Sequence, residues 1–311
     1  WLRPLDDWVT QEELDSIVDG AAMGNKYDGK LYRWPLVADI GLLYWRTDLM
    51  KEPPKTHDEL IKVSTKLIKE GRVKYGYAWQ GKQYEGLSCV FLEVLNGFGG
   101  EWLNGKDVGL NSIQSKKAAE WLLSLIKNGI SPSAVTNFSE PEALQLFKDG
   151  DAALMRNWPY AWAELNTPTS KVRGKVGLTT MVAEQGISPT STLGSWGFSL
   201  VRKSKNIDEA MEAIKFLTST ESQKQLFTVY GYTPTKKEVF NDEELTNSYP
   251  VLKSLEKGLQ VTKPRPQSPL YAQISDVLQR ELSSILTEQK RLSESLDDAT
   301  KNTQQILVSA G

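Results

Sequence analysis

Apolar positions along the chain alternate between helical spacing and extended runs. Residues 31–45 contain two dense apolar runs separated by Ala38-Asp39, and we interpret these runs as two strands. Residues 196–201 are predicted to form another strand, after a loop at 182–195 that is rich in Ser, Thr, Gly and Pro. The i, i+3, i+4, i+7 spacing of an amphipathic helix is met by Ala210, Ala213, Ile214 and Leu217. This succession of helices and strands predicts an α/β fold.

Two helices are predicted to begin at capping boxes. Thr10 is followed three residues later by Glu13, and Thr56 is followed three residues later by Glu59. At this spacing the hydroxyl and the carboxylate each accept a hydrogen bond from a backbone N–H group that the helix leaves unpaired. The first of these helices is expected to span residues 10–22.

Composition is that of an ordinary globular protein, and it argues against several classes of function. The 311 residues are enough for about two domains. With a net charge of −2 and dispersed basic residues, the chain carries no electrostatic signal for nucleic acid or an anionic membrane. The single cysteine, Cys89, excludes an intramolecular disulfide, and the single histidine, His57, leaves little for a zinc or redox-metal site. We therefore expect no metal, no cofactor and no nucleic-acid partner.

Two tryptophan segments give the strongest indication of ligand class. One reads Arg156-Asn157-Trp158-Pro159-Tyr160, and the other reads Gly194-Ser195-Trp196-Gly197. A flat apolar ring with polar neighbours fits the C–H face of a sugar while the sugar hydroxyls form hydrogen bonds. Packing of these rings in a core is an equally good interpretation of the two segments alone.

A set of motifs in a fixed order resembles one protein family. In chain order the motifs are Tyr27-Asp28-Gly29-Lys30, Asp39-Ile40-Gly41-Leu42-Leu43-Tyr44, Pro54-Lys55-Thr56, Tyr84-Glu85-Gly86-Leu87, Gly99-Gly100, Phe147-Lys148-Asp149-Gly150-Asp151, the two tryptophan segments, Gly231-Tyr232-Thr233-Pro234 and Arg265-Pro266. The match runs nearly from end to end. The chain resembles the extracellular solute-binding proteins of sugar ABC importers, and in particular their trehalose/maltose-binding branch. Each motif alone is weak evidence, whereas the ordered set is specific.

The resemblance implies a two-lobed, periplasmic-binding-protein-like (class II) α/β fold. Its discontinuous lobes are joined by crossing hinge strands and close on a sugar. Residues 1–40 and 198–245 are expected to form the first lobe, and residues 41–197 and 246–311 the second. Members of the family have a further stretch before the position of Trp1, so the first lobe is expected to lack its N-terminal strands here and, with them, several sugar contacts.

The resemblance also indicates ligand-binding residues, and two of them are charged. The full set is Asp39, Trp158, Tyr160, Gly194, Ser195, Trp196 and Arg265. A carboxylate between two apolar strands is unfavourable unless it is bonded, which favours bonds from sugar hydroxyls to Asp39 over a strand-end residue facing water. Arg265 stands rigidly between two prolines and can form fork-like bonds to sugar oxygens, although a surface arginine on a linker fits the sequence equally well.

The remaining candidates are the aromatic residues and the backbone beside them. Trp158 and Tyr160 match the motif at which the family has its stacking aromatics; the alternative is a wedge in the core, and it carries more weight for Tyr160. At Gly194-Ser195 the backbone is expected to approach the ligand next to Trp196 and to donate N–H groups. Relatives often have a second glycine in place of Ser195, so this chain is expected to have a narrower pocket or an added hydroxyl contact.

These residues favour a binding protein over an enzyme. The expected protein captures a neutral di- or oligosaccharide of the trehalose, maltose, sucrose or glucosylglycerol type and presents it to ABC permease membrane subunits. It is expected to be a monomer in the periplasm or outside the cell, with a lipid anchor to a membrane left open. A glycoside hydrolase is the alternative, but that chemistry needs two carboxylates and only Asp39 is placed at the ligand. A binder of a polyol or a peptide is a third interpretation.

Overall fold

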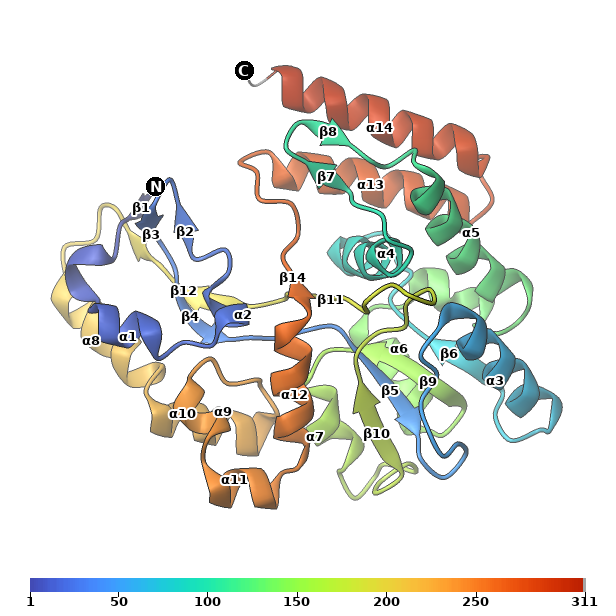
Figure 1. Cartoon of the computed structure of the whole chain (residues 1–311), viewed down its shortest axis with the longest axis horizontal. Coiled ribbons are helices and arrows are strands. Elements are labelled where there is room, and N and C mark those ends of the chain that lie inside the picture. The colour runs from blue at the N-terminus through green and yellow to red at the C-terminus, as the bar shows by residue number, and fades with distance from the viewer. Residues whose placement is uncertain (310–311) are drawn as a thin grey trace. The chain divides into compact units, whose positions relative to one another are not determined.

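The computed structural model describes residues 1–309, which fold into two compact units (Figure 1). Unit 1 consists of Trp1–Ile40, Pro159–Glu164 and Leu193–Pro264. Unit 2 consists of Gly41–Trp158, Leu165–Thr192 and the chain from Arg265 onward. The chain therefore passes repeatedly from one unit to the other, and each unit is assembled from segments that lie far apart in the sequence.

The observed units differ from the expected lobes at three places. The first boundary lies after Ile40, where it was expected. Residues 193–197 and 246–264, which we had assigned to the second lobe, belong instead to unit 1, as does the short segment 159–164. Residues 246–264 belong to unit 1 because the helix at 251–260 packs against the helix at 19–22, near the N-terminus. The position of 246–264 in the sequence does not reveal this contact.

A four-stranded mixed sheet forms the centre of unit 2 (Figure 1). Its strands, in spatial order, are β10 (Val176–Thr179), β5 (Leu42–Arg46), β9 (Ala152–Asn157) and β6 (Tyr75–Ala78). β9 and β6 run parallel, and the other two pairs are antiparallel. Every residue of β9 is buried, as expected for a strand covered on both faces. The short strands β7 (Leu103–Asn104), β8 (Asp107–Val108) and β11 (Ser191–Thr192) complete the strands of this unit.

Seven helices complete the described part of unit 2, and some of them pack directly on the sheet. They are α3 (His57–Lys69), α4 (Glu85–Gly97), α5 (Ile113–Lys127), the 3-10 helix η2 (Ser133–Asn137), α6 (Glu140–Lys148), α13 (Tyr271–Leu286) and α14 (Leu292–Ser309). α3 packs against β6 and α6 against β9, whereas α4 packs between α5 and α13 (Figure 1). α4 is buried at every position after Glu85, which explains why its sequence is apolar on nearly all sides.

Unit 1 is built on three antiparallel strand pairs. These are β1 (Leu2–Arg3) with β13 (Leu200–Val201), β2 (Lys26–Tyr27) with β3 (Lys30–Leu31), and β4 (Trp34–Val37) with β12 (Trp196–Phe198). Unit 1 also contains the short strand β14 (Thr262–Lys263). The residues that we had interpreted as one strand at 196–201 therefore form two strands with different partners.

The helices of unit 1 are short. They are η1 (Asp6–Trp8), α1 (Gln11–Asp15), α2 (Asp19–Ala22), α8 (Ile207–Leu217), α9 (Thr220–Tyr230), α10 (Lys237–Phe240), α11 (Glu243–Ser248) and α12 (Val251–Gln260). α12 packs against α2, α10 and α11. The helix α7 (Ala161–Leu165) follows the second tryptophan-proline step of the chain, at the boundary between the two units.

The expectation of a single helix at residues 10–22 was wrong. The expected helix at 10–22 is divided into α1 and α2, because Ile17 forms a β-bridge with Lys236 and the N–H of Val18 donates to the carbonyl of Thr235. The helix predicted from the apolar stripe at 210–217 forms as α8, and part of the stripe is buried: Ile214 lies in the core, whereas Leu217 is exposed.

Residues 1–309 provide neither a membrane-spanning helix nor a cluster of metal-binding side chains. None of the helices in this range combines the length and apolar character that crossing a membrane requires. Within the same range, His, Cys, Asp and Glu side chains do not gather in groups of three or more that could hold a metal ion.

Candidate functional site

Asp39 is a buried carboxylate in unit 1 whose hydrogen bonding is incomplete. It follows β4, is 6% exposed, and accepts a hydrogen bond from the backbone N–H of Thr233. Burial raises the pKa of Asp39 to about 7, although the Thr233 bond opposes the shift. Its Oδ1 and the hydroxyl of Thr233 have no hydrogen-bond partner among the described residues. Two neighbouring buried polar atoms of this kind are unfavourable unless a ligand or water bonds to them.

The pairing of β4 with β12 brings the second tryptophan segment beside Asp39. Trp196 lies opposite Val37, and the N–H of Gly194 donates to the main-chain carbonyl of Asp39 at 2.7 Å. The N–H of Gly194 is therefore already used within the protein, and the contact expected between the Gly194-Ser195 backbone and a ligand stays a prediction. The indole of Trp196 is 71% exposed, which makes its ring faces accessible on unit 1.

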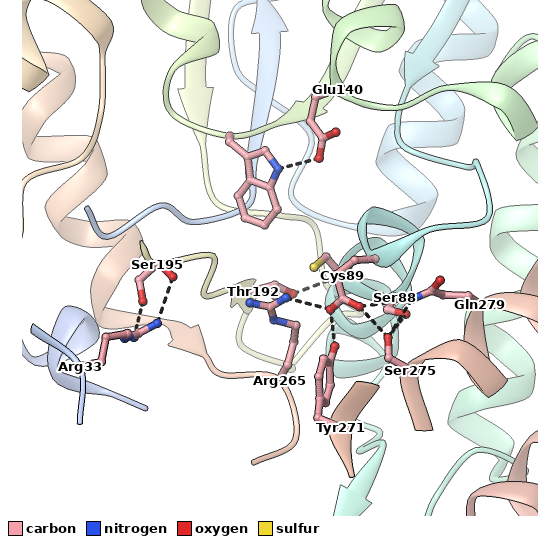
Figure 2. Close-up of polar contacts among 12 residues, drawn as sticks. Arg33, Ser88, Cys89, Glu140, Thr192, Ser195, Arg265, Tyr271, Ser275 and Gln279 are labelled. Carbon is pink, nitrogen blue, oxygen red and sulfur yellow. Dashed lines mark hydrogen bonds and ion pairs between the residues drawn. The ribbon is translucent and has the colours of Figure 1, made fainter. Parts of the chain in front are cut away.

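Ser195 is held by an arginine that the sequence did not single out. Arg33 donates from Nη2 to the Ser195 hydroxyl at 2.7 Å and from Nη1 to the Ser195 carbonyl at 3.1 Å (Figure 2). Its Nε donates to Asn25 at 2.7 Å. A serine hydroxyl that accepts one hydrogen bond still has a proton to donate. Ser195 thus has a fixed position and one donor, which is consistent with the hydroxyl contact expected there.

Tyr160 belongs to unit 1, although Trp158 two residues earlier belongs to unit 2. Tyr160 precedes α7 and is half-buried. Its backbone passes close to Gly231, which has a φ of 72° and ends α9 in the left-handed conformation. A Cβ at Gly231 would lie 3.4 Å from the Cα of Tyr160, so the glycine allows both the helix end and this close approach.

Trp158, at the end of β9, is held on its edge and on one face. Its indole Nε1 donates to Glu140 Oε1 at 2.9 Å, and Glu140 also accepts from the Tyr84 hydroxyl at 2.8 Å. The guanidinium of Arg156 lies 3.9 Å from the ring centroid, a stacked cation–π arrangement. The Trp158 carbonyl accepts from the Tyr44 hydroxyl at 2.8 Å. The side chain is half-buried, so the ring is neither sealed in the core nor free to rotate.

Arg156 is itself part of a buried ion pair. Both Arg156 and Glu93 have fully buried side chains, and two parallel bonds of 2.9 Å and 2.6 Å join them. Burial opposes the charge of Arg156, but the nearby Glu93 carboxylate outweighs it and raises the arginine pKa. Nη1 of Arg156 donates to Gln80 at 3.3 Å. The positive charge beneath Trp158 is therefore already compensated.

Arg265 lies in the irregular segment before α13 and is half-buried rather than fully exposed. It forms an ion pair with Glu85, with Nη1 and Oε1 2.8 Å apart, and its guanidinium stands 5.8 Å from the ring of Tyr271 (Figure 2). Tyr271 donates a short hydrogen bond to the same oxygen of Glu85. At least one of the N–H donors of Arg265 that were expected to contact a ligand is thus bonded to Glu85 instead.

The structure groups the candidate residues by unit. In unit 1 it brings together Asp39, Gly194, Ser195 and Trp196, and it adds Thr233 and Arg33. In unit 2 it contains Trp158 and Arg265, and it adds Glu140, Glu93 and Glu85. Thr233 and Glu85 occur within motifs that carried the resemblance, which was the available signal; the other three could not be recognised from the sequence.

A sequence profile described as bacterial extracellular solute-binding protein matches residues 1–224. The chain belongs to this family. A probable ABC transporter-binding protein from Deinococcus radiodurans is 33% identical to this solute-binding protein over 303 residues, which are 92% of this chain and 71% of the relative. The structure supports the same assignment by its similarity to solved structures.

Maltose-bound MalE3 of T. maritima superimposes on this solute-binding protein with a TM-score of 0.93 and 32% sequence identity, covering 98% of this chain and 80% of that one. An ABC transporter solute-binding protein from Agrobacterium radiobacter in complex with ribitol gives a TM-score of 0.88 at 25% identity, with the same two coverages. The expected two-lobed α/β fold of periplasmic binding proteins is thereby confirmed. The family consists of transporter binding proteins rather than enzymes, and its extracellular character fits a periplasmic or extracellular location.

Proposed function

We propose that this protein is the substrate-binding component of an ABC transporter that takes up a neutral di- or oligosaccharide. It captures a sugar of the trehalose, maltose, sucrose or glucosylglycerol type by hinge closure and delivers it to a membrane permease. It acts as a monomer in the periplasm or outside the cell. The relatives that bind maltose and ribitol support a ligand rich in hydroxyl groups.

The observation that carries the proposal is the fixed indole of Trp158. Glu140 holds its edge and Arg156 covers one face, so the opposite face is presented in a constant orientation. An aromatic ring held in this way stacks on the apolar face of a pyranose without losing further rotational freedom. We assign the same stacking function to Trp196 in unit 1 and a supporting contact to Tyr160.

The charges near these rings favour a neutral ligand. The guanidinium of Arg156 is paired with Glu93, and that of Arg265 is paired with Glu85. Because each positive group already has a counter-charge, an anionic ligand would find little net attraction. Asp39, with its unpartnered oxygen, is the acceptor that we assign to sugar hydroxyls, and the Ser195 hydroxyl is the accompanying donor.

A fluorescence titration tests the proposed function. Trehalose, maltose, sucrose and glucosylglycerol are added separately while the emission of the tryptophans is recorded. We expect a saturable change with at least one of the four sugars, because stacking on Trp158 or Trp196 alters the surroundings of an indole. The absence of a saturable change with all four would contradict the proposal.

An incubation with the tightest-binding sugar separates this proposal from a glycoside hydrolase. Retaining and inverting hydrolases place two carboxylates about 5 to 9.5 Å apart across the bond that is cleaved. Both oxygens of Glu140, the carboxylate nearest Trp158, accept hydrogen bonds from Trp158 and Tyr84. We expect the sugar to be recovered intact, and release of glucose at enzymatic rates would contradict the assignment as a binding protein.

A further inference from the structure

We infer that one face of helix α4 positions the two candidate ligand contacts of unit 2, Trp158 and Arg265. Glu85 holds Arg265, and Glu93 supports Trp158 through Arg156. This inference rests on the proposed function, and it assigns positioning residues that do not themselves contact the ligand.

The three residues that form this face are spaced four apart. Glu85, Cys89 and Glu93 therefore lie on the same side of α4, one turn above another. The carbonyl of Cys89 accepts from the Thr192 hydroxyl at 3.1 Å (Figure 2), and Glu93 Oε1 accepts from the Thr192 N–H at 3.2 Å. We call Glu85, Cys89 and Glu93 the α4 stripe.

Glu85 is saturated by donors and cannot serve as a ligand acceptor. Its Oε1 accepts from Arg265 and Tyr271, and its Oε2 accepts from Ser275 at 2.7 Å and from Gln279 at 3.3 Å (Figure 2). Three of these donors belong to α13, which packs against α4. The carboxylate is thus a rigid anchor between two helices, and its fourth bond fixes the guanidinium of Arg265.

This anchoring matters for binding because an arginine side chain is long and flexible. Ordering such a side chain when a ligand arrives costs roughly 0.5 to 1.5 kcal/mol. The contact with Glu85 removes that cost before binding and leaves other donors of Arg265 to form hydrogen bonds, because a guanidinium carries five N–H groups.

Glu93 performs the corresponding task for Trp158. Its two bonds to Arg156 place the guanidinium flat against the indole, 3.9 Å from the ring centroid. One ring face is therefore closed by protein, and only the other face is available for stacking. Without Glu93 the buried Arg156 would lose its counter-charge and the ring would lose its backing.

The α4 stripe also supports the residues at which the chain enters or leaves unit 2. These residues include Gly41, Trp158, Thr192 and Arg265. The N–H of Gly41 donates to the carbonyl of Thr192 at 3.1 Å, and a Cβ on Gly41 would lie 1.8 Å from Glu93 Oε1. The proposed ligand contacts of unit 2 and the ends of its segments thus rest on the same helix face.

A double-mutant cycle on Glu85 and Arg265 tests the first half of the inference. Glu85→Gln, Arg265→Ala and the double variant are titrated with the four sugars named above, and thermal unfolding is recorded for each. We expect each single change to weaken binding about tenfold, and the double variant to bind no more weakly than Arg265→Ala. Asp276→Asn is the matched control, because Asp276 forms an exposed ion pair with Arg280 on the same helix α13, and it should bind as the wild type does.

Two results would overturn this part of the inference. One is wild-type affinity in Glu85→Gln, and the other is additive losses in the double variant, which would show that Glu85 acts independently of Arg265. Absence of binding by the wild-type protein to all four sugars is a separate result: it overturns the proposed function, and the inference falls with it.

The second half requires a paired substitution, because Glu93→Gln alone leaves a buried charge and destabilises the fold strongly. Glu93→Leu with Arg156→Met removes both buried charges together, so that neither is left without its partner. We expect this double variant to fold, with an unfolding temperature near that of the wild type, and to bind sugar about tenfold more weakly. Folded protein with wild-type affinity would show that Trp158 needs no support from Glu93 and Arg156.

Discussion

Asp39 is a residue whose charge changes with pH near neutrality. Burial raises its pKa to about 7, so the carboxylate gains a proton as the pH falls below that value. Because the carboxylate is the proposed acceptor for sugar hydroxyls, we expect affinity to fall toward about tenfold per pH unit in the acid range. Dissociation constants measured from about pH 5 to about pH 9 check this expectation.

Asp39→Asn provides the control for this pH dependence. The amide keeps one oxygen acceptor and does not titrate, so the variant should bind more weakly but with a flat profile. The sign for folding is the reverse of that for binding: the folded pKa lies above the ordinary 3.8, so the folded state holds the proton more tightly and stability decreases as pH rises between these values. A variant that retains the wild-type binding profile would exclude Asp39 as its origin.

The burial of His57 predicts a second effect of pH, which changes the free energy of unfolding and not the affinity for a ligand. Its ring stacks on Phe98 at 4.1 Å, burial lowers its pKa from 6.5 to about 4, and both ring nitrogens lack partners among residues 1–309. The folded state therefore binds fewer protons than the unfolded chain, so stability is complete above about pH 6.5 and decreases by roughly 3 kcal/mol as the pH falls to about 4. Denaturant unfolding of wild type and His57→Phe measures it, and an equal acid loss in both would contradict the assignment.

For single residues, the sequence predicted burial better than it predicted hydrogen-bond partners. Asp39 was expected to be a buried carboxylate because apolar strands flank it, and it is buried. Gly194 and Arg265 were expected to offer donors to a ligand, but Asp39 and Glu85 take those donors in whole or in part. Such partners come from segments up to 180 residues apart, and a single sequence contains no signal that pairs them.

Local signals predicted the individual elements where those signals were strong. The capping boxes at Thr10 and Thr56 both form as predicted. The expected helix at 10–22 failed because pairing of Ile17 with Lys236 interrupts it. Contacts between distant segments thus override helical spacing in unit 1.

Gly41 directly precedes strand β5 and lies against Glu93 of the α4 stripe. A substitution of Gly41 therefore tests how these two elements pack. An added Cβ would lie 1.8 Å from Glu93 Oε1 and 2.6 Å from Arg156 Nη2. Gly41→Ala must therefore separate the buried ion pair or shift β5, and we expect it to lower the free energy of unfolding by roughly 3 kcal/mol or more. Denaturant unfolding checks this, and a wild-type midpoint would show that the ion pair tolerates displacement.

For the whole molecule, the order of motifs predicted the family, whereas the division into units required the structure. Long stretches of the chain, such as 41–158, belong to a single unit, but the short segment 159–164 belongs to the other unit. As a result Trp158 and Tyr160, two residues apart in one motif, belong to different units. The sequence motif does not show this division, because it follows from contacts with distant segments.

Calorimetric titration of the wild type and Trp158→Ala with trehalose, maltose, sucrose and glucosylglycerol tests the central claim most directly. Trp1→Ala serves as control, because Trp1 is fully exposed and is not a proposed contact. We expect the wild type and Trp1→Ala to bind one of these sugars with equal affinity, and Trp158→Ala to remain folded at the temperature of the titration but bind about thirtyfold more weakly. Undiminished binding by folded Trp158→Ala would contradict the account.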